Sequence, residues 1–192
     1  VNIENNLTGG VHFYNGVASQ LSVYFYHSDA SSLNIRHNQI GGVTNNIFKG
    51  ALSSFKLIYM NGDTSPFELS GNVISGITAD NSFDDDFYGI HVRNGIGAPT
   101  ISNNIIEDIN ISGITTEPRF YGIRSDNHNT IIDSNIIRKV NLDSRYSTRQ
   151  FNGIDCNRSS NSATIRNNLI CDIKLLNTSI AAGAAGIYTS GL

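Results

Sequence analysis

The residues whose types could carry out chemistry follow a recurring Gly-Ile pair. They are one histidine, two arginines, two aspartates and one tyrosine: His91, Arg93, Arg124, Asp126, Asp155 and Tyr188. If each isoleucine points into a core, strand alternation turns the residues one and three places after it outward. A base candidate, cations, carboxylates and an aromatic ring would then share one outer face.

Three interpretations of this outer face are open. An arginine can neutralise the carboxylate of an acidic sugar while a base removes the neighbouring proton, which is lyase chemistry. The same groups would also suit passive binding of a sugar chain. Alternatively, opposite charges on neighbouring strands only keep an exposed face soluble. Alignment of the repeats predicts Tyr26 and Ile58 in one outward column with His91, and Ser28 and Met60 in a second column with Arg93.

The elements that must position these residues belong to a repeat. A nine-residue pattern recurs six times, and its asparagines lie 31 to 34 residues apart: Asn6, Asn38, Asn72, Asn104, Asn135 and Asn168. A second apolar segment follows each asparagine, and in the last four repeats it contains Gly-Ile. The 26 isoleucines outnumber the 11 leucines, and 25 asparagines and 18 glycines accompany them, which is a composition of strands and bends.

This repeat predicts an all-β fold: a right-handed parallel β-helix solenoid of about six coils of roughly 32 residues, forming a single domain over 1–192. A leucine-rich solenoid is the main alternative, because Ile101 to Ile109 resembles half of that motif. The long period, the preference for isoleucine and the second strand signal in each repeat disfavour it. Because the chain starts within the pattern, we expect it to be a segment of a longer protein.

Like positions of successive coils should form columns spaced by about 4.8 Å. The asparagines are predicted to form an internal ladder, because each amide can donate to and accept from the next. Each asparagine is also expected to take the left-handed bend between strands. Two inward columns are predicted, one of Ile90, Ile123, Ile154 and Ile187, the other of Ile40, Ile74, Ile106, Ile137 and Ile170.

The asparagine stacking, the Gly-Ile strand and the N-x-I-x-x-I run together resemble the parallel β-helix repeat family of pectate-lyase-like secreted proteins. The resemblance spans the chain from about Ile3 to Tyr188. It implies a polysaccharide groove along the outer face of the Gly-Ile strands, with the six residues above as substrate contacts, and an extracellular or cell-surface location. Signatures of the family's enzymes are missing, including the Gly-His-Gly of polygalacturonases, so no catalytic residue is assigned.

The charge pattern limits the partners and cofactors that we expect. The net charge is −3 and the 13 lysines and arginines are scattered, so nucleic acid is not expected. No apolar run approaches the roughly 20 residues that cross a bilayer, so membrane insertion is not expected. Calcium at Asp84, Asp85 and Asp86 would need further ligands such as Asp80, Glu117 or Asp126. A solvated acidic loop is favoured, and no metal or cofactor is assigned.

The function expected first is a non-catalytic β-helix segment of a secreted or cell-surface protein, structural and able to bind polysaccharide. The alternative is a polysaccharide lyase or other carbohydrate-active enzyme acting in the groove of the Gly-Ile column, and the sequence leaves open whether the chain is an enzyme. Neither end shows a polar, helical or irregular cap. We therefore expect the coil ends to stack on neighbouring domains or subunits.

Overall fold

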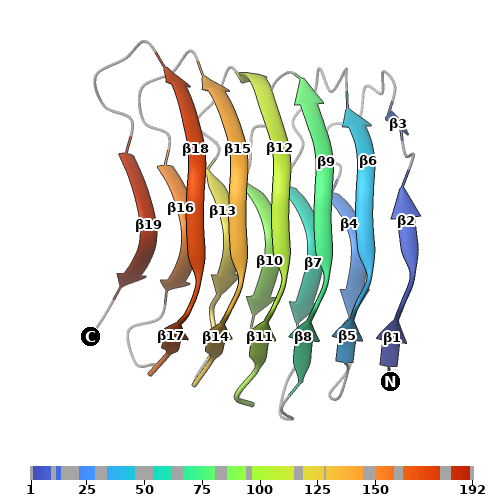
Figure 1. The fold of residues 1–192 in the computed structure, drawn as a ribbon, viewed down its shortest axis with the longest axis vertical. Helices are drawn as coiled ribbons and strands as arrows, with labels where there is room; N and C mark the ends of the chain where they lie inside the picture. The colour runs from blue at the N-terminus through green and yellow to red at the C-terminus, as the bar shows by residue number, and fades with distance from the viewer. Residues whose placement is uncertain are drawn as a thin grey trace.

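The computed structural model describes residues 2–9, 12–13, 22–28, 34–45, 54–61, 67–80, 86–93, 97–114, 119–127, 129–144, 150–157, 162–177 and 183–190. All regular elements in these ranges are β-strands. Within them, no helix has the length and apolar character needed to span a membrane. The all-β parallel solenoid predicted from the repeat is confirmed (Figure 1).

Three parallel sheets form the walls of the solenoid. Sheet A contains the short strands β1 (Asn2–Glu4), β5 (Asn34–Arg36), β8 (Glu68–Ser70), β11 (Thr100–Ser102), β14 (Ile131–Asp133) and β17 (Thr164–Arg166). Sheet B contains β2 (Leu7–Gly9), β6 (Gln39–Asn45), β9 (Val73–Asp80), β12 (Ile105–Ile114), β15 (Ile136–Ser144) and β18 (Leu169–Asn177), with β3 (His12–Phe13) also paired to β6. Sheet C contains β4 (Ser22–Ser28), β7 (Ser54–Asn61), β10 (Phe87–Arg93), β13 (Phe120–Ser125), β16 (Gln150–Asn157) and β19 (Gly183–Ser190).

Each sheet takes one strand from every repeat, so the chain passes through each sheet six times. In Figure 1 the strands of sheet B rise on the near side and those of sheet C descend behind them, while the chain advances from right to left. This is a right-handed coil, the hand that nearly all connections between parallel strands of one sheet adopt.

The core consists of the two predicted isoleucine columns with an aromatic column beside them. Ile90, Ile123 and Ile154 are 0% exposed, and the interior members of the second column are equally buried. The rings of Phe87, Phe120 and Phe151 stack in successive coils, with centroids 5.2 and 5.3 Å apart. Like side chains therefore pack on like side chains along the axis, and dispersion contacts between them stabilise the stack.

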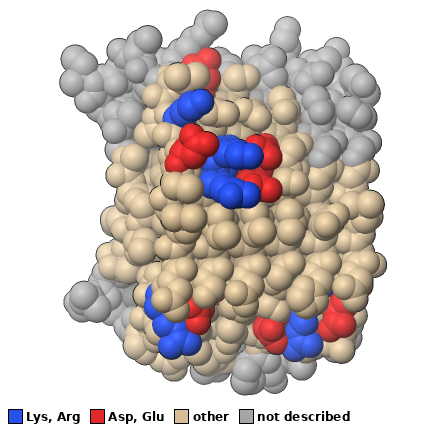
Figure 2. Space-filling view, in the orientation of Figure 1, with Lys and Arg blue, Asp and Glu red and all other residues tan. Residues whose placement is uncertain are grey.

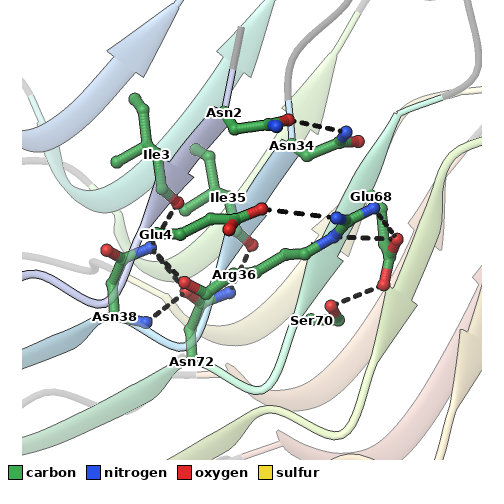
Figure 3. A network of polar contacts seen from close by, with 10 residues as sticks. All are labelled: Asn2, Ile3, Glu4, Asn34, Ile35, Arg36, Asn38, Glu68, Ser70 and Asn72. Carbon is green, nitrogen blue, oxygen red and sulfur yellow. Dashed lines mark hydrogen bonds and ion pairs between the residues drawn. The ribbon is translucent and has the colours of Figure 1, made fainter.

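The asparagine ladder is confirmed and runs through all six repeats. Nδ2 of Asn38 donates to Oδ1 of Asn72 at 3.1 Å, and the next asparagines are linked in the same way at 2.9 to 3.0 Å (Figure 3). The main-chain nitrogens of the first five ladder asparagines donate to the same oxygen one coil further on. The ladder therefore pairs the backbone of each bend as well as the side chains.

The predicted place of the left-handed bend was wrong by one residue. Positive φ angles occur at the residue before each ladder asparagine: Asn5, His37, Gly71, Asn103, Ser134 and Asn167. The ladder asparagines themselves do not have a positive φ. The preceding residue makes the turn, which leaves the asparagine side chain directed into the ladder.

The Gly-Ile glycines have a packing role that explains their recurrence. A Cβ on Gly122 would lie 2.6 Å from the carbonyl oxygen of Gly153 and 2.7 Å from Cδ1 of Ile137. We expect Gly122→Ala to lower the free energy of unfolding by about 1–3 kcal/mol, because backbone atoms must shift to admit the methyl group. Urea denaturation followed by circular dichroism measures this loss.

Gly186→Ala is the matched control, because a Cβ there would lie 4.0 Å from Cδ1 of Ile170, its nearest neighbour. Both variants restrict the unfolded chain equally, so their difference isolates the clash. Equal denaturation midpoints for the two variants would show that close approach is not why glycine occupies this column.

Candidate functional site

The candidate site is the outer surface of sheet C. Along these strands, residues of the hydrophobic core alternate with side chains that point outward. The outward set, called the sheet C face below, comprises Lys56, Tyr59, Tyr88, His91, Tyr121, Arg124, Asp126, Asn152 and Asp155. The register of the parallel strands β7, β10, β13 and β16 brings eight of these residues into two columns, one residue per coil in each. The ninth, Asp126, directly follows β13.

Aromatic rings and cations pack against one another on the sheet C face. The rings of Tyr88 and Tyr121 stack with centroids 5.0 Å apart, and the His91 ring stacks on Tyr88 at 4.5 Å. Nζ of Lys56 lies 4.6 Å from the centroid of Tyr59, and Cζ of Arg124 lies 4.9 Å from that of Tyr121. Such cation–π pairs favour the positive charge close to the ring face.

A three-member polar network adjoins these rings. Nε2 of His91 contacts Oδ2 of Asp126 at 3.1 Å, and Nε of Arg124 donates to Oδ1 of the same carboxylate at 3.1 Å. His91 is only 5% exposed and Asp126 is also buried. The carboxylate therefore has two partners and little access to solvent.

The direction of the pKa shifts defines the protonation states in the network. Burial lowers the pKa of His91, and this outweighs the opposing influence of Asp126. For Asp126, burial alone would raise the pKa, but the bonds from His91 and Arg124 and the positive charge of Arg124 lower it. Neutral His91 thus donates from Nε2 to an ionised Asp126. Its buried Nδ1, which has no partner among the described residues, is the unprotonated nitrogen.

Asp155 lies one coil beyond Arg124 in the same column. Asp155 is 2% exposed, and its Oδ2 accepts a hydrogen bond from Nδ2 of Asn152 at 3.0 Å, while no described residue donates to Oδ1. Burial raises the pKa of Asp155, and the nearby charge of Arg124 opposes the rise. The pKa values of the two carboxyl groups of the sheet C face are thus shifted in opposite directions, down for Asp126 and up for Asp155.

The structure brings together only part of the predicted site. His91, Arg124 and Asp126 touch, and Asp155 adjoins them in register. Arg93 is exposed at the end of β10, and Tyr188 is half-exposed on β19. Among the described residues, no hydrogen bond or ion pair joins either of these to the network.

The two outward columns predicted through His91 and Arg93 were wrong by one residue in the strands β4 and β7. Ile58 aligns with Ile90 and is buried, so it belongs to the inward column, and Tyr26 is in register with Ile58. Tyr59 is the residue that aligns with His91. Ser28 and Met60 align likewise with Val92, and Asn61 aligns with Arg93. Met60 is fully buried in the core.

Sequence reasoning missed the tyrosines Tyr59, Tyr88 and Tyr121 and the lysine Lys56. The sequence contains a pattern that could have indicated two of these tyrosines, because Phe-Tyr precedes Gly-Ile in two repeats, at Phe87-Tyr88 and Phe120-Tyr121. Where the phenylalanine points inward, alternation turns the tyrosine outward.

The proposed calcium loop falls largely outside the described residues, which include neither Asp84 nor Asp85. Asp86 is described, and it accepts hydrogen bonds from the hydroxyl of Tyr88 and the main-chain nitrogen of Arg119, both at 2.9 Å. Within the described ranges, no group of three or more His, Cys, Asp or Glu side chains is arranged to hold a metal ion.

The fold defines the chain as a parallel β-solenoid with an internal asparagine ladder. A scan against protein-family models, a search of curated proteins and a search of solved structures each found no match. What the sheet C face does must therefore be argued from its own geometry. In that geometry the tyrosine rings and both carboxylates are buried, whereas Lys56 and Arg124 are partly exposed and Arg93 is exposed.

Proposed function

We propose that the chain is a non-catalytic β-solenoid segment of a secreted or cell-surface protein, and that its sheet C face binds polysaccharide. The observation that supports this proposal is the pairing of the acid–base groups. His91 and Asp126 are buried and bonded to each other, so neither is placed to exchange a proton with a substrate in solution. Partly exposed Lys56 and Arg124 are suited to hold the acidic groups of a sugar chain. The buried rings of Tyr59 and Tyr121, against which they pack, hold these two cations in place.

The resemblance of the ladder and the Gly-Ile column to pectate-lyase-like proteins supports the extracellular or cell-surface location. It also supports a sugar chain as the ligand, because stacked coils present equivalent positions at about 4.8 Å intervals along a straight face. A polymer of repeating units can then contact several coils at once, and many weak contacts add up along its length.

A glycan array, run with and without calcium, tests the proposal. We expect an acidic polysaccharide to bind, and Arg93→Ala to weaken that binding about fivefold or more, because Arg93 is an exposed cation at the end of β10 in sheet C. Arg138→Ala is the matched control, since Arg138 lies on the outer face of sheet B and pairs with Glu107. Equal loss for both variants, or no binding at all, would contradict binding at the sheet C face.

A polysaccharide lyase is the second candidate, and one observation favours it. The pKa of Asp155 is raised and that of Asp126 is lowered within one face, an arrangement that separates acid and base roles in enzymes. Incubation of each bound glycan, followed by ultraviolet absorbance of the unsaturated product, distinguishes the two. Absorbance that grows with wild type and not with Asp155→Asn would establish the enzyme.

A further inference from the structure

The outer face of sheet B carries an apolar row on interior coils. Val73, Ile105 and Ile136 are in register on β9, β12 and β15, and each is partly exposed. The next residues along β12 and β15, Ile106 and Ile137, are 0% exposed, so the row lies on the side of the sheet opposite the core. Figure 1 shows the strands of sheet B on the near side of the molecule, with no described strand in front of them.

Two ion pairs lie beside the apolar row, both between the same two strands. Nε of Arg138 on β15 donates to Oε2 of Glu107 on β12 at 2.7 Å. Nζ of Lys139 lies 3.5 Å from Oδ1 of Asp108, and the four side chains are 18 to 50% exposed. Figure 2 shows charged side chains of both signs gathered over sheet B, with an uncharged band between them and the lower edge of the molecule. On this face β12 therefore presents two negative charges and β15 two positive charges.

This charge pattern is self-complementary about one axis. A twofold axis that runs along the strands, midway between β12 and β15, places β12 of one molecule opposite β15 of a second copy. Glu107 then faces Arg138 of the second copy, and the second ion pair is matched in the same way. Because the axis is parallel to the strands, each row faces the same row, so Ile105 packs on Ile136.

The same face does not match itself about a neighbouring axis. An axis along β12 itself would place Glu107 opposite its own copy, and like charges that face each other directly are destabilising. With the axis between β12 and β15, β9 faces β18 of the second copy. There Ser75 meets Cys171, and Thr78 meets Lys174, so the lysine faces an uncharged residue.

The size of the face is that of a weak dimer interface. The four strands β9, β12, β15 and β18, spaced by about 4.8 Å and about 25 Å long, cover on the order of 500 Å². Two such faces bury about 1,000 Å², the lower limit for a specific interface, so we expect a dissociation constant on the order of 10 µM. Glycan binding measured well below that concentration reports on the monomer, so the Arg138→Ala control above is unaffected.

We propose that the chain forms a twofold-symmetric dimer through the outer face of sheet B, with Glu107 of each molecule paired to Arg138 of the other. The Ile105–Ile136 contacts lie beside these pairs and exclude water from them. The contact uses the sides of the coils and needs no free coil end. It also leaves the sheet C face uncovered, since sheet C lies behind sheet B in Figure 1. An isologous contact closes on itself, so association stops at two copies.

Sedimentation velocity over concentrations that span the expected dissociation constant tests the dimer. We expect the wild-type chain to convert from monomer to dimer and to form no larger species. Glu107→Arg and Arg138→Glu should each weaken dimerisation at least tenfold, because each places like charges opposite one another across the axis. An equimolar mixture of the two variants should dimerise about as tightly as wild type, because the heterodimer again has opposite charges at both contacts.

The mixture separates the contact between molecules from the ion pair within one molecule. Glu107 and Arg138 also pair within the chain, and that pair stays broken in both variants, so its repair cannot explain recovery in the mixture. Arg36→Glu is the matched control, because it reverses an arginine that pairs with Glu4 and Glu68 on the outer face of sheet A. It should leave dimerisation unchanged.

Circular dichroism should show the same strand content in all variants, and Asp108→Lys with Lys139→Asp repeats the test on the second ion pair. Four results would overturn the proposal: a monomer at every concentration, species larger than a dimer, a dimer that Glu107→Arg leaves intact, or a mixture of the two variants that stays monomeric.

Discussion

Asn104→Ala is expected to lower the free energy of unfolding by about 3–6 kcal/mol, because it removes an interior rung of the ladder. The Asn104 side chain donates to Oδ1 of Asn135 and to the carbonyl of Leu69, at 3.0 and 2.8 Å. Its Oδ1 accepts from the main-chain nitrogen and Nδ2 of Asn72. Alanine leaves these partners buried without a bond, and each such group costs about 1–3 kcal/mol.

Urea denaturation measures this loss of unfolding free energy. Two further variants identify its cause. Asn104→Asp keeps the size and the acceptor but cannot donate, so a large loss there assigns the effect to hydrogen bonds rather than to a cavity. Asn110→Ala is the surface control, because exposed Asn110 only accepts one bond from Asn141 on the outer face of sheet B. Its loss should stay within about 0.5 kcal/mol. Similar losses for Asn104→Ala and Asn110→Ala would contradict a stabilising ladder.

Asp126→Ala is expected to cost about 3–5 kcal/mol, since it leaves the Arg124 guanidinium without its counter-ion in a largely buried setting. The Arg124 side chain is 17% exposed, and His91, the other partner of Asp126, is neutral. The loss is measured by the same denaturation experiment. Nitrogen-detected NMR of the imidazole provides a second readout, because Nε2 of His91 should carry the proton in the wild type at neutral pH.

The comparison for Asp126 is Glu107, whose partner Arg138 is 40% exposed. Solvent screens that pair, so Glu107→Ala should cost less than about 1 kcal/mol. Two results would contradict a buried network of Arg124, Asp126 and neutral His91. One is an equal loss of unfolding free energy in Asp126→Ala and Glu107→Ala, and the other is a charged His91 at neutral pH.

The fold could be predicted because the ladder repeats in the sequence. The recurrence of the ladder asparagines, such as Asn38, Asn72 and Asn104, gives the number of residues in each coil. Isoleucines at fixed sequence separations from these asparagines show which face of each strand is buried. The left-handed position was misplaced because several residue types occupy it, including His37 and Ser134. No single residue type there marks the turn, so its exact register could not be read from the repeat.

The site was harder to predict for two physical reasons. First, the early coils lack Gly-Ile, and Leu57 stands where later coils have glycine, so alignment by apolar residues moved Ile58 outward by one place. Second, alternation predicts only the direction of a side chain, whereas burial depends on its neighbours. The rings of Tyr59 and Tyr88 pack against His91. Tyr59 belongs to the neighbouring strand β7, and strict alternation along β10 would place Tyr88 and His91, three residues apart, on opposite sides of the sheet.

The self-contained bonding of each coil has a consequence for how such a molecule can change in length over evolution. One repeat carries its own ladder asparagine, its own left-handed turn and one strand for each sheet, and it meets only the repeats before and after it. A duplicated gene segment of one repeat would therefore insert between two existing coils without altering the contacts of any other. A chain that lengthens by duplication of a repeat therefore needs no new complementary surface, because the two sides of each coil already fit the coils before and after it.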